Sequence, residues 1–456
     1  MRFLRAGVAV LGLALLSGSA DAQVPARDPD EGWPVGERVL TKYKAGRYAE
    51  VTAEGPAAIE AEPWNAELRL ALANSYLWTM REWEAIEHYR ALLDNPRHAT
   101  DARIGIANTL AWSGRMHEAI PHYELALSSP KAGEAKLGLA NAWLWLGRPD
   151  ISAPLYDQLR AEHPMEDVGI EGQIRARRQL RPKTTIGFGY LHDNTPTTRR
   201  EPFVSHTFRM LDNTLIFGVG ATGGEDYNDD RRLDRREYGF HFEAVAIPLA
   251  PRISVWRQTD PVEKTFGEVR LQVAPWPLHV YGGRVNWGKQ AFTVPALEQG
   301  LSADRYGVDG RYQFPIGELR GYANTNDISD GNRVNNADVR LTTRYRPWGR
   351  EIKPFVGVAL RYSDREDPDY WSPRRYGVGY VGLEGEWDTL PWMVNAIVQV
   401  GFGIIGDASA AYGGSIIARR WLSESWAVGL NGYAQGGTRT SNYRAHGLTV
   451  FLEKLW

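Results

Sequence analysis

Charged side chains alternate with apolar ones in several short segments of the second half of the chain. Between Asp338 and Tyr345, an acid and two arginines share alternate positions with a threonine, and apolar residues take most of the others. Guanidinium groups donate several hydrogen bonds, and carboxylates accept them. The candidate residues of these charged faces are Glu268, Arg270, Arg305, Asp309, Arg311, Asp338, Arg340, Arg344, Glu384 and Glu386. Opposite charges on one face can also form a purely structural ladder, and both interpretations stay open.

Residues that would indicate catalysis or metal binding do not form a recognisable pattern. His88 and His122 recur at a fixed spacing, but we expect them to lie about two stacked helices apart, too far to share a metal ion. There is no phosphate-binding loop, no nucleophile motif and no cysteine. We therefore expect no catalytic residues, no metal and no cofactor, although side chains from separate strands can converge without a local motif.

The charged faces require strands to position them. From Lys183 onward the hydrophobic period is two, and sixteen segments up to Leu455 fit a strand, with roughly 14 or 18 as alternatives. We expect tight links, such as residues 211–213, to alternate with longer polar links. The expected longer links are residues 224–236, 288–304 and 327–335. Short turns at one end and longer loops at the other are typical of outer-membrane barrels.

The end of the chain supports a closed barrel. Leu448, Val450 and Leu452 fall on one face of the last segment, which stops on a tryptophan, although Lys454 falls on the same face. A sheet in lipid must close on itself, because unpaired backbone groups are costly there. A charge that faces lipid near the midplane costs ~2–4 kcal/mol, so we expect the charged faces to point into the lumen. The closing strand of a soluble sandwich is the alternative.

The first half of the chain repeats with a period of 33 to 34 residues between about Gly36 and Pro164. Leu-Ala-Asn before Trp78 recurs as Ile-Ala-Asn before Trp112 and as Leu-Ala-Asn before Trp145. This period is that of tetratricopeptide repeats, with two antiparallel helices in each unit. We count four repeats and expect most of the repeated Trp and Tyr side chains in the core. The concave face of such a stack usually binds protein.

The ends and the composition complete the division into domains. Residues 1–22 have a basic start, an apolar centre and a small-residue cleavage site, as a secretory signal peptide does. We predict a linker at 23–36, the repeat domain at 37–166, a capping helix and linker at 167–182, and the barrel at 183–456. The formal net charge of −2 does not suggest a nucleic-acid partner.

Repeats of the form Leu-Ala-Asn-x-x-x-Trp-x-Gly-Arg ahead of a barrel resemble the exopolysaccharide secretion proteins of Gram-negative bacteria. These include the cellulose synthase operon protein C family, the poly-N-acetylglucosamine export porin and the smaller YaiO-like outer-membrane proteins. The segment that contains Tyr370, Trp371, Ser372, Pro373 and Tyr376 is similar to a motif ahead of a strand in these families. Since Ser-Pro also favours turns, a plain loop-to-strand turn is the structural alternative.

The resemblance implies an outer-membrane, porin-like protein that exports a polysaccharide and is not an enzyme. Its repeat domain would lie in the periplasm and dock a synthase subunit or a glycan-modifying protein, and its barrel would be monomeric and surrounded by lipid. With about four repeats, the chain is shorter than the known exporters and is similar to the YaiO-like members. A non-transporting scaffold, receptor or adhesin is therefore the alternative.

Overall fold

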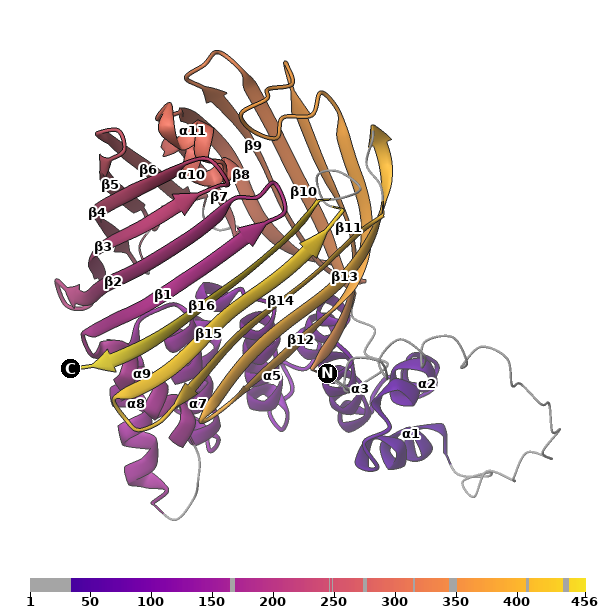
Figure 1. The fold of residues 1–456 in the computed structure, drawn as a ribbon. Coiled ribbons are helices and arrows are strands. Elements are labelled where there is room, and N and C mark those ends of the chain that lie inside the picture. Colours follow the sequence, from indigo (N-terminus) through magenta and orange to yellow (C-terminus); the bar gives the residue numbers. More distant parts are fainter. Residues whose placement is uncertain are drawn as a thin grey trace, which may run out of the picture.

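The computed structural model describes residues 34–164, 169–245, 247, 249–273, 277–314, 316–343, 351–406, 410–437 and 443–456. The predicted signal peptide and residues 23–33 of the predicted linker lie outside this range. A helical unit is followed by a barrel, as Figure 1 shows. None of the helices described is both long and apolar enough to cross a membrane.

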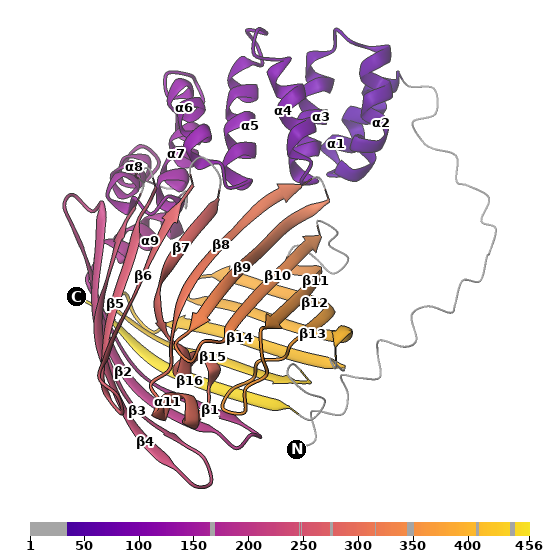
Figure 2. The same ribbon diagram turned by 90° about the horizontal axis from the view of Figure 1, so that it is seen from above.

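The helical unit consists of four pairs of helices and a ninth helix, and this confirms the predicted repeats. Figure 2 shows them side by side in one row. Their bounds are α1 Val35–Lys44, α2 Tyr48–Ala61, α3 Ala66–Trp78, α4 Glu82–Arg90, α5 Ala99–Trp112, α6 Met116–Ala126, α7 Ala132–Trp145, α8 Pro149–Glu162 and α9 Ile170–Leu180. The helix in the predicted capping segment is α9.

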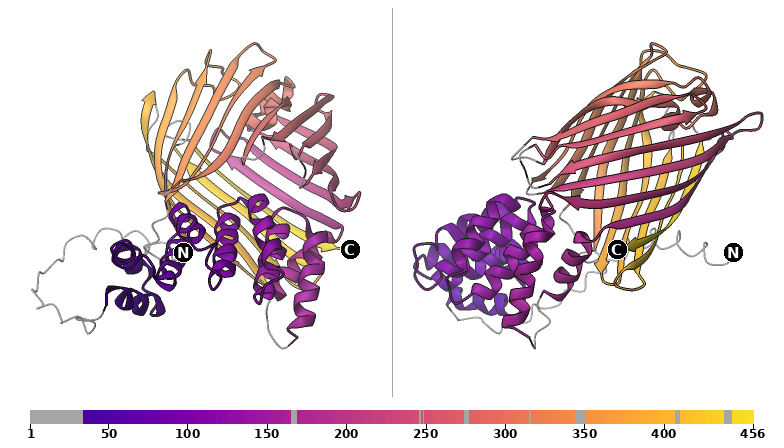
Figure 3. Two further views of the ribbon diagram at one scale, coloured as in Figure 1. Left: turned by 180° about the vertical axis from the view of Figure 1, so that it is seen from behind. Right: turned by 90° about the vertical axis from the view of Figure 1, so that its left-hand side faces the viewer.

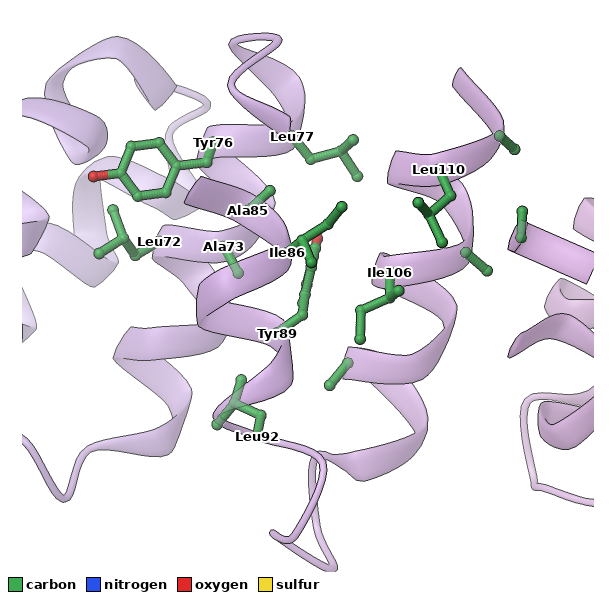
Figure 4. Packing of buried hydrophobic residues seen from close by; sticks show 14 of the residues in the cluster. Leu72, Ala73, Tyr76, Leu77, Ala85, Ile86, Tyr89, Leu92, Ile106 and Leu110 are labelled. Carbon is green, nitrogen blue, oxygen red and sulfur yellow. The ribbon is translucent and has the colours of Figure 1, made fainter. Parts of the chain in front are cut away.

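The last three repeats are each held together by the same hydrogen bond between their two helices. A tyrosine hydroxyl in the second helix donates to an asparagine side chain in the first helix, over 2.5 to 2.6 Å. The bonded pairs are Tyr89–Asn74, Tyr123–Asn108 and Tyr156–Asn141. These tyrosine rings are fully buried in the apolar core, part of which is drawn in Figure 4. The repeated Asn and Tyr of the sequence therefore recur because they form this hydrogen bond between the two helices.

Glycine lets the next repeat approach these rings. A Cβ atom on Gly105 would lie 2.4 Å from the Tyr89 ring, and one on Gly138 would lie 2.2 Å from the Tyr123 ring. No side chain fits at such distances, so the first helix of each following repeat presents bare backbone to the tyrosine. This contact fixes the spacing between neighbouring repeats.

The repeated tryptophans do not follow the prediction that they are core residues. Trp78, Trp112 and Trp145 end the first helices of their repeats and keep 41%, 43% and 49% of their surface exposed. The prediction holds for the tyrosines and is wrong for these tryptophans. The reason is their position, because the last residue of a helix projects at the edge of the stack rather than between the helices.

The second half forms a closed barrel of sixteen antiparallel strands in sequence order. The strands are β1 Lys183–Asp193, β2 Thr198–Met210, β3 Leu215–Tyr227, β4 Arg232–Ala244, β5 Arg252–Asp260, β6 Lys264–Gln272, β7 Leu278–Asn286 and β8 Ser302–Phe314. They continue as β9 Gly317–Ile328, β10 Arg333–Thr343, β11 Ile352–Ser363, β12 Tyr376–Thr389, β13 Trp392–Gly406, β14 Ala411–Trp421, β15 Trp426–Gly436 and β16 Arg444–Leu455. Strand β16 pairs with β1, from Leu455 opposite Lys183 to Ala445 opposite Asp193. The predicted strand number and closure are confirmed.

Apolar side chains cover the outer face of this barrel. Register carries one face from strand to strand, since Val339 lies opposite Val358 and Ile186 lies opposite both Leu452 and Val204. These positions are largely exposed, whereas the alternate positions line the interior. Exposed apolar residues of the outer face include Ile186, Val204, Val219, Phe240, Val280, Val308, Val339, Val358, Val381, Val400, Leu430 and Val450.

The predicted alternation of short and long links is only partly right. Residues 224–236 and 327–335 are mostly strand, because β3, β4, β9 and β10 extend further than the apolar pattern shows. What remains of each link is a turn of four residues, 228–231 and 329–332. The polar ends of these strands are paired as fully as the apolar parts, and hydrophobic periodicity alone does not reveal them.

The link at 287–301 contains two short helices instead of an open loop. Helix α10 spans Trp287–Ala291 and α11 spans Val294–Glu298. Both lie inside the outline of the barrel wall in Figures 1 and 2. Trp287 and Ala296 are buried in one apolar cluster with strand residues such as Ile328, so this inner loop, defined here as residues 287–301, packs against the barrel wall.

Candidate functional site

The helical unit lies against the end of the barrel at which β1 begins and β16 ends. Arg175 of α9 forms an ion pair of 2.8 Å with Asp388 of β12, and Arg181 donates to the backbone oxygen of Trp456 at 3.0 Å. From the barrel side, Arg209 of β2 donates to the Gly147 oxygen at 2.9 Å. Figure 3 shows the helices at this end from two further sides.

A cavity of about 930 Å³, here called the shared cavity, lies between the repeats and the lumen. The repeats contribute residues 114–118 and Trp145, and the barrel contributes inward residues such as Tyr322 and Tyr380. Four of the predicted site residues line it too. These are Asp309, Arg311, Asp338 and Arg340. The turns of the third and fourth repeats therefore face the open space inside the barrel.

Most of the other predicted site residues also occupy inward positions. Glu268 and Arg305 line a second cavity of about 540 Å³ next to the inner loop. Glu384 is buried and Glu386 is exposed, both on the inward face of β12. Arg344 lies outside the described residues.

Many of the inward charges form ion pairs with one another. Arg270 pairs with Asp309, and Arg340 with Glu384 at 3.2 Å, while its guanidinium lies 4.8 Å from the centre of the Phe355 ring. Other ion pairs on the inward face are Lys353–Glu386, Arg419–Glu453 and Arg252–Glu243. The structural interpretation of the charged faces as an ion-pair ladder therefore applies to these residues. The resulting surface is polar but close to neutral.

The predicted aromatic motif forms a folded loop between β11 and β12. The Tyr370 hydroxyl donates to Asp330 at 2.8 Å and accepts a hydrogen bond from Asn332 at 3.0 Å. Tyr376 begins β12, and its ring meets the Trp371 ring edge-on at 4.9 Å. Ser372 is buried and Pro373 half-buried between them. The turn interpretation describes the backbone, and in addition Trp371 lines two cavities of the lumen.

Sequence reasoning missed Tyr322 and Arg361, which lie beside the predicted motif residue Trp371 in these cavities. Tyr322 lines the shared cavity and two smaller cavities of about 230 and 310 Å³. Arg361 and Trp371 line both smaller cavities, and the Arg361 guanidinium lies 4.7 Å from the Trp371 ring centre. Extending the inward face along β9 and β11 identifies Tyr322 and Arg361, but no sequence signal brings Trp371 beside them.

A cluster of charges holds the inner loop to strands β2 and β4. Lys289 of α10 contacts Glu237 at 2.7 Å and Glu201 at 3.2 Å. Behind these acids, Arg235 is 1% exposed and pairs with both of them and with Asp226. Removing one partner from such a buried cluster leaves an uncompensated charge, so the loop has a defined position across this part of the lumen.

The lumen thus combines three features: neutral ion pairs, aromatic rings and space. Its hydrogen-bonding groups suit a polar, hydroxyl-rich solute, because donors and acceptors alternate and no single charge dominates. The rings of Tyr322, Tyr380 and Trp371 offer faces to apolar parts of such a solute.

Comparisons with known proteins show what this chain is similar to. No protein-family model matches it, and no curated protein matches it. Among solved structures, a bacterial polysaccharide outer membrane secretin is 10% identical, with a TM-score of 0.47, over 61% of this chain and 99% of that chain. OccK11 of Pseudomonas aeruginosa is 11% identical, with a TM-score of 0.33, over 60% of this chain and 96% of that chain.

The helical unit has its own structural neighbour. A tetratricopeptide repeat protein from Parabacteroides merdae is 17% identical, with a TM-score of 0.29, over 34% of this chain and 60% of that chain. These likenesses are too distant to carry an argument about function. The order of parts implied by the sequence resemblance, repeats and then a barrel, is the order that the structure has.

Proposed function

We propose that this protein is an outer-membrane conduit for a polysaccharide. The observation that carries the proposal is the shared cavity, because it joins the repeat turns to the lumen of a closed barrel. A polymer that enters between the repeats and the barrel end would meet a polar and aromatic lining. The proposal has three further supports: the outer surface, the charge of the lumen and the position of the repeats.

The apolar outer surface supports placement in a membrane. Exposed apolar residues such as Val339, Val400 and Val450 encircle the barrel, and an exposed apolar band of this extent needs an apolar environment. The start of β1, the end of β16 and the repeats all lie at one end of the barrel. This end would therefore face the periplasm. The repeat domain would then meet the polymer or its synthase and modifying proteins there.

The lumen charge supports a neutral or weakly charged polymer. Arg270–Asp309 and Arg340–Glu384 cancel one another along the wall. A strongly anionic or cationic polymer would be favoured by a lumen of the opposite charge. Hydroxyl groups instead bind alternating donors and acceptors, as this wall provides.

A non-transporting scaffold, receptor or adhesin is the second candidate, and the inner loop favours it. Residues 287–301 occupy part of the lumen and are held by Lys289. A loop that fills the bore would leave a barrel without a path.

Planar-bilayer conductance of the refolded full-length protein separates the two functions. A conduit gives stable single-channel currents that a neutral oligosaccharide interrupts, and Lys289→Ala, which removes two of the ion pairs that hold the loop, raises the conductance. A barrel that conducts in neither form would support the scaffold and refute the conduit.

A further inference from the structure

A row of aromatic side chains, three of them exposed and one half-buried, follows the edge of the repeats that carries their turns. Its members are Tyr48, Trp78, Trp112 and Trp145, one from each repeat, and they are here called the aromatic row. The three tryptophans keep about two fifths to one half of their surface exposed. Large exposed aromatic patches on a water-facing domain usually mark a binding surface.

The row is continuous over the first three repeats. The Tyr48 and Trp78 rings stack with centres 6.2 Å apart, and the Trp78 and Trp112 rings meet at 5.5 Å with a tilt of 52°. One repeat further along, Trp145 lines the shared cavity beside the turn at Gly114. The row therefore leads from the free end of the helical unit to the space that opens into the lumen.

Ion pairs accompany the row at every turn. An arginine at the start of each second helix pairs with a nearby carboxylate over 2.5 to 2.8 Å. The pairs are Arg47–Glu50, Arg81–Glu84, Arg115–Glu118 and Arg148–Asp150. The hydrogen bond from Arg115 lowers the pKa of Glu118, so this pair stays ionised on both sides and neutral in sum. The border of the row thus carries hydrogen-bonding groups without net charge.

We propose that the aromatic row is a binding track for a neutral polysaccharide and guides it to the shared cavity. The track rests on the proposed conduit function and assigns this edge of the repeats to the polymer itself rather than to a protein partner. Sugar rings have apolar C–H faces that stack on indole and phenol rings, and their hydroxyl groups bind the neighbouring ion pairs. A protein partner gains nothing from a surface that ends at the mouth of a lumen, whereas a linear polymer does.

Binding to the full-length protein in detergent micelles tests the track. The probe is a neutral hexasaccharide of β-1,4-linked glucose, followed by isothermal titration calorimetry, with a hexamer of galacturonic acid as the charged comparison. Replacing both Trp78 and Trp112 by Ala should weaken binding of the neutral probe by about tenfold or more, because two stacking contacts are lost. The charged hexamer should bind more weakly than the neutral one to the unaltered protein.

Two variants guard against indirect effects. Trp64 lies between α2 and α3 with 78% of its surface exposed, off the row, so Trp64→Ala should leave the affinity unchanged. Trp112→Phe keeps an aromatic face and should retain most of the affinity for the neutral probe. Absence of binding to the unaltered protein, equal loss in Trp64→Ala, or a preference for the charged hexamer would overturn the track.

Two further measurements test whether the row contacts lipid and whether it is needed for export of the polymer. Quenching of Trp78 and Trp112 by brominated acyl chains in nanodiscs would make the row a lipid contact and overturn the track. In cells, the double Ala variant should lower surface polysaccharide. Unchanged surface polymer in that variant refutes the track but not the conduit, whereas unchanged polymer in a strain without the gene refutes the conduit and the track with it.

Discussion

Met80 occupies a backbone position that the other repeats give to glycine. Its φ of 62° lies in the left-handed region, as do those of Gly46, Gly114 and Gly147. A side chain in this conformation costs about 1 kcal/mol. Met80→Gly should therefore raise the free energy of unfolding of the repeat domain by about that amount, as urea denaturation would measure. Gly114→Ala is the matched control and should lower it.

Two histidines should make the repeat domain sensitive to acid. Burial lowers the pKa of His88 and of His122, and neighbouring Arg69 and Arg103 lower it further. Each Nδ1 is buried without a hydrogen-bond partner among the described residues. Since the unfolded chain then binds protons more readily than the folded chain below about pH 6.5, stability should fall as pH drops through this value.

Thermal denaturation of the repeat domain at pH 7 and pH 5 checks this expectation. The midpoint should be lower at pH 5, and replacing both histidines by Gln should reduce the difference. A difference that persists unchanged in this variant would assign the pH dependence to other groups.

At the scale of single elements, the repeats should fold without the barrel. Their apolar core is internal, and the described contacts with the barrel, such as Arg175–Asp388, are polar and at the edge. Residues 23–180, expressed without the signal, should give a helical circular-dichroism spectrum. A β-rich or disordered spectrum would contradict the repeat assignment.

The inner and outer faces of the barrel wall should respond in opposite ways to charge. Arg311 lines the shared cavity, and Arg311→Glu should shift the ion selectivity of the channel toward cations without loss of assembly. Arg340 is less suitable, because a carboxylate in its place would lie beside Glu384. Reversal potentials in a salt gradient measure the shift.

The outer face supplies the control. Val339→Arg puts a charge toward lipid, costs ~2–4 kcal/mol near the midplane and should impair insertion. Impaired assembly in Arg311→Glu, together with normal assembly in Val339→Arg, would mean that the two faces are inverted.

Periodicity predicted the elements of this chain well. A period of two gave sixteen strands and the inward or outward side of Val339 and Arg340, because alternation is a local property of the backbone. A period of 33 to 34 residues gave four repeats, because each unit must bury the same face against its neighbours. The exposed Trp78 was misjudged, since repetition alone does not separate a core residue from one at the edge.

The parts of the site that depend on distant contacts were beyond local patterns. Lys289 reaches Glu201 and Glu237, which precede it by about 90 and 50 residues. Trp371 meets Arg361 through the folding of a loop and not through a strand face. Such positions depend on how loops of unequal length cross the lumen, and alternation contains no information about this.

On the scale of the whole molecule, the repeats and the barrel together form one path in the proposed conduit. The aromatic row, the shared cavity and the cavities around Tyr322 follow one another from the repeats to the inner loop. The path therefore depends on the contact between the helical unit and the barrel, where Arg209 donates a hydrogen bond to the Gly147 oxygen.

Surface polysaccharide in a strain that lacks this gene tests the central claim most directly. The conduit predicts that polymer on the outside falls while synthesis continues and polymer accumulates inside the cell. The full-length gene, supplied again, should restore the surface polymer. Unchanged surface polysaccharide in the strain without the gene would contradict the account.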